Sequence, residues 1–226
     1  MTQTPALSTR VALVLPALNE AKSIAAVVAA VAPYGQAIVV DDGSTDETGN
    51  LARAAGALVV RHEVNRGYDQ ALASGIAFAI KGGADFAITM DADGQHQPRI
   101  LADFLEKLED GADIVIGKRD RHQRFSESVF SAVASFLWGV SDPLCGMKGY
   151  RLARLRDLPS LCTYPSIGTE LAIRTLRSGY RVDQVPVMTL DRQGASRFGR
   201  GLRANYLILR AMFTGMLAAR PLPQQR

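Results

Sequence analysis

The stretch Phe86–Gln95 (FAITMDADGQ) decides how the rest of the sequence is interpreted. Its first five residues form an apolar run typical of a buried strand, and two carboxylates follow. Asp91 and Asp93 are two positions apart, so both can bind one cation, and Gln95 can add a neutral oxygen. Mg²⁺ and Mn²⁺ prefer oxygen ligands and usually bind a few carboxylates together with substrate phosphates and water. The stretch alone is compatible with a metal site at a strand end, and also with Asp93 and its neighbours capping the helix that Pro98 begins, so the rest of the sequence has to decide.

Composition indicates an ordinary globular chain. Its 226 residues suffice for one α/β domain with a small appendage, 47% of them are hydrophobic, and the net charge is +4. No apolar run reaches the roughly 18–20 residues that cross a bilayer, so we expect no membrane-spanning segment. The N-terminus lacks the basic segment followed by an apolar segment that is typical of a signal peptide. Cys145 and Cys162 form no disulfide or zinc pattern, which indicates reduced thiols of a cytosolic protein.

Strand-like and helix-like segments alternate along the chain. Apolar runs that predict strands lie at residues 11–15, 37–40, 57–60, 86–90 and 113–116. The first should end at Pro16. Asn19 is a predicted N-cap for a helix over residues 19–32, and Ser44–Glu47 has the spacing of a capping box for a helix that stops near Gly56. Further helices are predicted over residues 67–80 and from Pro98 onward.

Strands separated by single helices favour an α/β fold with a mostly parallel sheet covered on both faces. In such sheets, ligands bind beyond the carboxyl ends of the strands. Polar segments follow four of the predicted strands, at residues 16–20, 41–42, 91–95 and 117–119. We therefore expect these segments to meet at one edge of the sheet.

Six motifs occur in the order seen in family-two glycosyltransferases of GT-A fold. They are Pro16-x-x-Asn19-Glu20, Val40-Asp41-Asp42-Gly43-Ser44, Asn65-x-Gly67, Asp91-Ala92-Asp93-x-Gln95, Gly117-x-Arg119 and Asp142-Pro143-x-Cys145-Gly146. Later segments resemble the dolichyl-phosphate mannose synthase, or polyprenyl-phosphate glycosyltransferase, branch; they are Gly168-x-Glu170, Val185-Pro186-Val187 and Arg192–Arg197. The resemblance implies a GT-A (Rossmann-like) catalytic domain over residues 10–200. A disordered start (1–9) and an amphipathic basic C-terminal helix and tail (201–226) would flank it.

The resemblance also implies a nucleotide-sugar donor, GDP-mannose or a UDP-sugar, and a Mg²⁺ or Mn²⁺ cofactor. Residues that match the donor-binding positions are Pro16, Leu18, Glu20, Val40, Asp42, Gly67, Asp91, Ala92, Asp93, Arg119, Arg192 and Arg197. Asp42 would accept hydrogen bonds from the nucleobase; the alternative for Asp41 and Asp42 is a solvated turn in which one of them caps a helix. Gly67 permits close backbone approach at a helix start but could be an ordinary loop glycine. The ion, held by Asp91, Asp93 and Gln95, would stabilise the departing nucleoside diphosphate.

By the same resemblance, Arg119 and Arg124 would hold the phosphate of the acceptor, because guanidinium groups bind phosphate in a two-point manner. A phosphate monoester is already anionic at neutral pH, with a second pKa of about 6, so it needs positioning more than a general base. A sugar hydroxyl would need a carboxylate base, for which Asp142 and Glu170 are the candidates. Asp142 could instead organise its own turn, and Glu170 could simply sit early in a helix.

Three functions stay open on sequence grounds. The first is an inverting transferase that acts on polyprenyl or dolichyl phosphate, peripheral on the cytoplasmic face of the membrane. The second is a transferase that acts on a sugar hydroxyl of a glycan or glycolipid, and the third is a non-catalytic nucleotide-sugar-binding subunit. A membrane-protein partner or a second copy would fit any of them, and we expect no nucleic-acid partner.

The C-terminal segment predicts a helix from Leu202 to about Leu217. Apolar residues share one face of it: Leu202, Tyr206, Leu209, Phe213 and Leu217. Arg203 and Arg210 lie together on a different face of this helix. Such a helix can lie in the headgroup region of a membrane, or it can pack on the protein itself or a second subunit.

Overall fold

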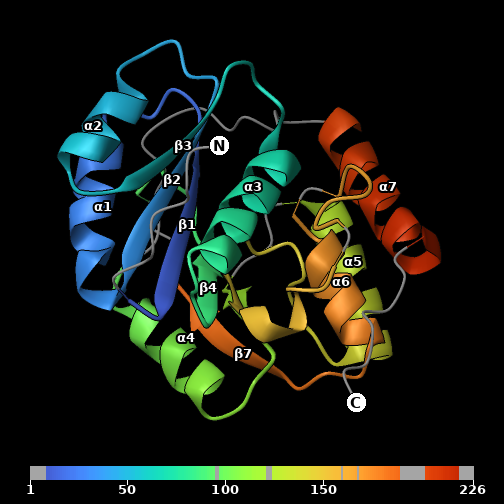
Figure 1. The fold of residues 1–226 in the computed structure, drawn as a ribbon. Helices are drawn as coiled ribbons and strands as arrows, with labels where there is room; N and C mark the ends of the chain where they lie inside the picture. Colours follow the sequence, from blue (N-terminus) through green and yellow to red (C-terminus); the bar gives the residue numbers. More distant parts are fainter. Residues whose placement is uncertain are drawn as a thin grey trace.

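A computed structural model describes residues 9–94, 97–120, 124–158, 160–166, 168–188 and 202–218. Its centre is a seven-stranded sheet of order β3-β2-β1-β4-β6-β5-β7 (Figure 1). The strands are β1 Val11–Ala17, β2 Gln36–Asp42, β3 Leu58–His62, β4 Phe86–Thr89, β5 Ile114–Arg119, β6 Lys148–Arg151 and β7 Val182–Val187. Only β6 pairs in antiparallel fashion, with β4 and β5. The predicted mostly parallel sheet is therefore confirmed.

The described residues also form seven α-helices and two short 3-10 turns, of which all but the last helix lie between strands. The helices are α1 Ile24–Val31, α2 Thr48–Ala54, α3 Tyr68–Lys81, α4 Ile100–Glu109, α5 Phe125–Trp138, α6 Glu170–Arg177 and α7 Leu202–Ala218. The turns are η1 Ala32–Tyr34 and η2 Leu152–Arg154. Among these described helices, none combines the length and apolarity that crossing a membrane requires.

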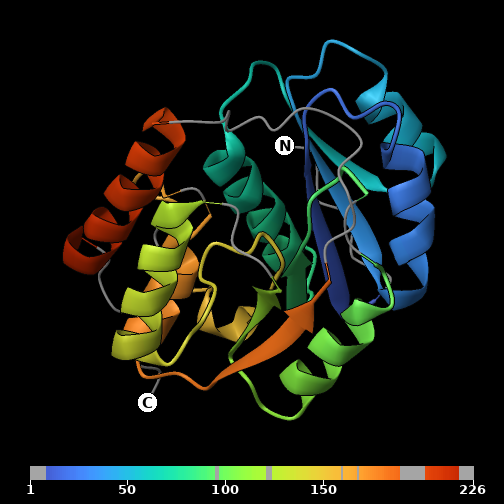
Figure 2. The ribbon, with the colours of Figure 1, turned by 180° about the vertical axis from the view of Figure 1, so that it is seen from behind.

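Helices cover both faces of the sheet. α1 and α4 bury Val28, Leu101 and Phe104 against one face, and α3 and α6 bury Ile76 and Ala172 against the other. Figure 1 looks onto the face that carries α3, and Figure 2 shows the molecule from behind. A third apolar cluster joins α5, α6 and α7, so the predicted C-terminal helix packs on the rest of the chain. The domain boundary near residue 200 stays a prediction.

Pro16 does not end the first strand, as the sequence had suggested. β1 runs on to Ala17, with Pro16 in register with Val40 of β2. On its other side, β1 pairs with β4 only as far as Val14. Proline is tolerated there because its missing N–H lies where the strand has one neighbour instead of two.

The two predicted N-caps at the first helices were also wrong. Asn19 has a left-handed backbone (φ 53°), and its side chain accepts a hydrogen bond from the Thr45 N–H at 2.9 Å. Ser44 Oγ accepts from the Asn19 N–H at 3.0 Å, so it caps no helix. α2 begins only at Thr48, whose N–H donates to the Asp46 side chain. Both cap sequences instead join two loops at the carboxyl end of the sheet.

Candidate active site

The strand ends that the sequence predicted to converge do meet. Asp42 is the last residue of β2, and Arg119 is the last residue of β5. The hydroxyl of Ser23, just before α1, donates to the Ala92 carbonyl oxygen at 2.9 Å. This bond joins the loop after β1 to the loop after β4. The loops after these strands therefore form one site at the carboxyl edge of the sheet.

Asp42 occupies a buried position between β2 and the loop before α3. Its side chain accepts hydrogen bonds from His62 Nδ1 at 2.6 Å and from the N–H groups of Arg66 and Gly67 at 2.9 Å each. The neighbouring Asp41 is fully buried and accepts from the Ser44 N–H at 2.9 Å. The solvated-turn alternative therefore does not describe this pair. Asp42 remains the candidate contact for a nucleobase.

Other predicted donor residues lie close to Asp42. Pro16 and Val40 are direct neighbours across β1 and β2. The loop that carries Leu18 and Glu20 is fixed by a hydrogen bond from the Glu20 N–H to Thr48 Oγ1 at 2.8 Å. Gly67 has a φ of 89°, a conformation that favours glycine, at the N-terminus of α3. These positions lie at the carboxyl ends of β1 and β2 and at the start of α3, and their role in donor binding stays a prediction.

The turn after β4 carries two of the predicted metal ligands, Asp91 and Asp93. Tyr68 Oη donates to Asp91 Oδ1 at 3.1 Å, which fixes this carboxylate. A Cβ atom at Gly146 would lie 2.9 Å from Asp91 Oδ2, so glycine at this position lets the carboxylate pack against the backbone. Within the described residues, no cluster of three or more His, Cys, Asp or Glu side chains could hold an ion. The carboxylates of Asp91 and Asp93 are oxygen donors of the kind that Mg²⁺ and Mn²⁺ prefer, and the other ligands of these ions are commonly substrate oxygens and water. Gln95 lies outside the described residues.

Tyr68 is a residue of this site that sequence reasoning missed. Burial, together with the adjacent Asp91 charge, raises the pKa of its phenol well above the usual value. The hydroxyl therefore stays protonated and keeps donating to Asp91 at any physiological pH. Its position directly after Gly67, at a helix start facing the Asp91 turn, is the feature that could have identified it.

The two predicted phosphate-binding arginines share one carboxylate. Arg119 Nη2 lies 3.4 Å from Glu127 Oε2, and Arg124 Nη1 lies 2.7 Å from Glu127 Oε1. Burial would lower the pKa of Arg119, but its hydrogen bonds and charge attraction to Asp142 outweigh this and raise the pKa above its usual value. Arg119 is therefore a permanent cation, 17% exposed, at the rim. Glu127 is a second residue that sequence reasoning missed.

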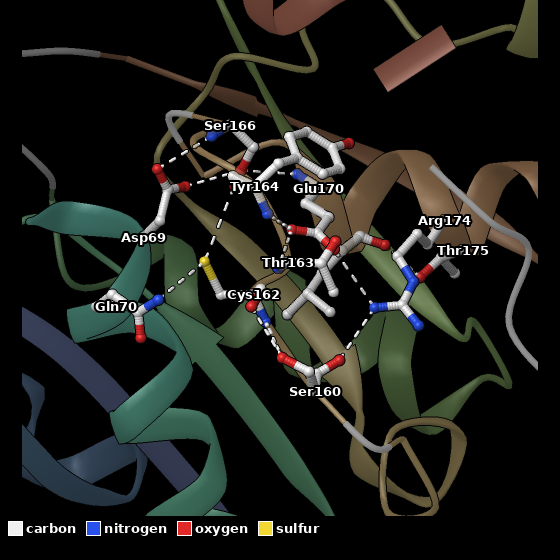
Figure 3. Close-up of polar contacts among 11 residues, drawn as sticks. Asp69, Gln70, Ser160, Cys162, Thr163, Tyr164, Ser166, Glu170, Arg174 and Thr175 are labelled. Carbon is white, nitrogen blue, oxygen red and sulfur yellow. Dashed lines mark hydrogen bonds and ion pairs between the residues drawn. The ribbon is translucent and has the colours of Figure 1, made fainter. Parts of the chain in front are cut away.

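Both candidate general bases are held by protein donors. Asp142 is buried, and each of its carboxylate oxygens accepts from the Arg119 guanidinium, at 2.7 and 2.9 Å. Glu170 opens α6 and accepts from the backbone and hydroxyl of Thr163 at 2.7 and 2.6 Å (Figure 3). Arg174 Nη1 also lies 3.5 Å from Glu170. Both carboxylates therefore organise the protein around them.

A buried lysine is the least expected group at the site. Lys148 opens β6, is 2% exposed, and donates from Nζ to the Cys145 carbonyl oxygen. Burial lowers the pKa of its ammonium group, and nearby Asp142 and Asp91 counteract this. Its position in the sequence, three residues after Cys145, did not indicate that it would be buried at the site. Arg192 and Arg197, which match donor-binding positions of the family, lie outside the described residues.

Comparison with known proteins agrees with this geometry. The glycosyl transferase family 2 profile matches residues 12–155. The chain belongs to glycosyl transferase family 2. This match confirms the resemblance drawn from the motifs, and the matched segment contains the site residues from Pro16 to Gly146.

Relatives within the family include enzymes named for lipid phosphates. The dolichyl-phosphate hexose transferase of Haloferax volcanii is 31% identical over 82% of this chain and 85% of its own length. The polyprenol monophosphomannose synthase of Mycolicibacterium smegmatis is 30% identical, covering 81% and 78%. A crystal structure of glucosyl-3-phosphoglycerate synthase from Mycobacterium tuberculosis, with Mn²⁺ and UDP, matches with a TM-score of 0.71 and 25% identity. It covers 95% of this chain and 81% of that one.

Proposed function

We propose that this glycosyltransferase moves a sugar from a nucleoside-diphosphate sugar to the phosphate of a polyprenyl lipid, with inversion at the anomeric carbon. The proposal rests on the environment of the two candidate bases, Asp142 and Glu170. Both are buried and bound by protein donors, so neither is poised to deprotonate a hydroxyl acceptor. A phosphate acceptor is already anionic and needs no base. The names of the two lipid-phosphate relatives support the same acceptor class.

In this mechanism the chain positions two phosphate-bearing substrates. Asp42 and the residues near it bind the nucleoside, and Gly67 lets the backbone approach the donor. Asp91 and Asp93 would hold a divalent ion, which would supply positive charge to the donor diphosphate. Arg119 and Arg124 orient the acceptor phosphate. Its oxygen then forms a bond to the anomeric carbon while the bond to the nucleoside diphosphate breaks.

We assign the enzyme a peripheral position on the cytoplasmic face of the membrane, where a lipid phosphate would be reached. Tyr206, Phe213 and Leu217 of α7 support this placement because they are 64%, 56% and 84% exposed. The stripe that the sequence marked as apolar thus includes three outward-facing side chains. A membrane-protein partner or a second copy of the chain could cover the same stripe.

The hydroxyl-acceptor alternative keeps one argument in its favour, namely the structural similarity to a synthase crystallised with glucosyl-3-phosphoglycerate. One experiment separates the alternatives. The protein is incubated with polyprenyl phosphate in vesicles and with a panel of labelled nucleotide sugars, and organic-extractable label is measured. A sugar–phosphate–lipid product loses its label in mild acid, whereas a glycoside does not. Acid-stable label would contradict the proposal, and no label with any donor would favour a non-catalytic binding subunit.

A further inference from the structure

The hydrogen bonds of Asp42 leave its carboxylate with little capacity for a ligand. Oδ1 accepts from His62 Nδ1 and from the Arg66 N–H, and Oδ2 accepts from the Gly67 N–H. An ionised carboxylate offers about two acceptor positions on each oxygen. Counting the donors among the described residues, Oδ1 is filled and Oδ2 retains one position.

The surroundings of Asp42 limit access in the same way. Its side chain is only 6% exposed, which suits contact with one donor atom better than contact with a whole base edge. Gly43 follows with a φ of 77°, and a Cβ atom there would lie 2.6 Å from the Asn65 backbone nitrogen. The loop before α3 therefore packs directly on the backbone that carries Asp42, and the carboxylate has little freedom to turn.

His62 is fixed from both sides. Its Nδ1 faces a carboxylate, which only accepts, so Nδ1 carries a proton. Its Nε2 lies 2.9 Å from the hydroxyl of Ser74 on α3. In the neutral ring Nε2 accepts from this hydroxyl, which favours the tautomer that donates to Asp42. The ring is 5% exposed, so water does not compete for either nitrogen.

From these contacts we infer that His62 selects the nucleobase of the donor, because it fills Oδ1 and leaves Asp42 one acceptor position. Guanine presents a ring N–H and an amino N–H side by side, and pairing both with one carboxylate needs both oxygens. Uracil presents a single ring N–H, which the remaining position on Oδ2 can accept. The donor is then a uridine-diphosphate sugar. This inference rests on the proposed donor site.

Binding of nucleotides alone tests the inference without any transfer reaction. Dissociation constants for UDP, N3-methyl-UDP and GDP are measured by calorimetry on the full chain with Mg²⁺. N3-methyl-UDP is the matched probe because it lacks only the ring N–H. We expect UDP to bind roughly ten- to a hundredfold more tightly than either of the others, the range for a hydrogen bond to a charged group. GDP binding as tight as that of UDP would overturn the inference.

Two substitutions at the same position separate selectivity from folding. His62→Leu removes the donor to Oδ1 and should reduce the preference for UDP over GDP by about tenfold or more. His62→Asn places an amide N–H near the position of Nδ1 and should keep most of the preference. Ser74→Ala is a milder change and should reduce the preference for UDP over GDP severalfold. It replaces His62→Leu in the test if that variant does not fold. A preference that is unchanged in His62→Leu, or in Ser74→Ala where His62→Leu fails, would refute the role of His62.

The two proposals fail in different ways. A chain that prefers UDP but transfers no sugar to lipid phosphate would refute the proposed function and leave the role of His62 intact. A chain that transfers sugar from GDP-mannose to lipid phosphate and binds GDP best would support the proposed function and refute the role of His62. If no nucleotide bound at all, the donor site itself would be wrong, and both would fall.

Discussion

Asp142 holds Arg119 in a two-point ion pair, from Nε to Oδ2 at 2.7 Å and from Nη2 to Oδ1 at 2.9 Å. The Arg119 N–H donates to the same Oδ2 at 3.1 Å. Such a pair fixes the plane of the guanidinium, so its remaining N–H groups point in a set direction. Asp142 is therefore better described as a positioning residue for Arg119 than as a general base. This relationship makes the arginine the most informative site for substitution.

Arg119→Ala should abolish transfer to the lipid phosphate while sparing much of the binding of nucleotide alone. It also leaves the buried Asp142 without its partner, which typically costs about 3–5 kcal/mol of folding stability. The measurements are transfer rate, nucleotide affinity and thermal melting. The double variant Arg119→Ala with Asp142→Ala is the control, because it should regain stability but not transfer. If Arg119→Ala transferred sugar at the wild-type rate, the acceptor site would have to lie elsewhere.

The proposed dependence on a divalent ion can be tested at the turn after β4. Asp93→Asn should reduce turnover by orders of magnitude, since it removes a charged ligand of the divalent ion, and should leave thermal melting almost unchanged. Asp103→Asn, at an exposed carboxylate of α4, is a matched control that should not affect turnover. Excess chelator should abolish activity, and added Mg²⁺ or Mn²⁺ should restore it. Full activity in chelator would rule out the assignment.

The sheet and its functional edge could be predicted from the sequence because apolar runs and the polar residues after them are local features. The position of β6 could not, since its antiparallel pairing with β4 and β5 depends on contacts between distant residues. The same limit applies to single side chains. A carboxylate near a strand end has the same sequence pattern whether it binds a ligand, as proposed for Asp42, or an arginine, as Asp142 does. Local cap patterns failed at Asn19 and Ser44 because those side chains bond to each other's loops.

Stability should fall in mildly alkaline solution because of Cys145. Burial raises the pKa of this thiol from its ordinary value of 9.0 to about 11, so the folded chain retains a proton that the unfolded chain loses. Between these two values the folded state binds more protons, and the free energy of unfolding must decrease as pH rises. At pH near 10.5 the loss should be about 2 kcal/mol. Denaturant unfolding at pH 8.5 and 10.5 measures it, and Cys145→Ala should lose less between the two pH values. An equal loss in the variant would assign the effect to other groups.

The membrane prediction can be tested more sharply than by removing the C-terminus. Truncation before Leu202 would also remove Ile208 and Met212, which are buried against α5 and α6. Phe213→Ser with Leu217→Ser changes only outward-facing side chains of α7, so the fold should persist. Loss of this apolar area should weaken sedimentation with anionic liposomes, and added salt should weaken the binding of the wild-type chain, because basic residues near the surface contribute about 1 kcal/mol each. Leu51→Ser, at a partly exposed leucine of α2, is the control and should sediment like the wild type. Equal sedimentation of the double variant would show that α7 does not contact the membrane, and a change from dimer to monomer would assign its outer stripe to a second copy of the chain.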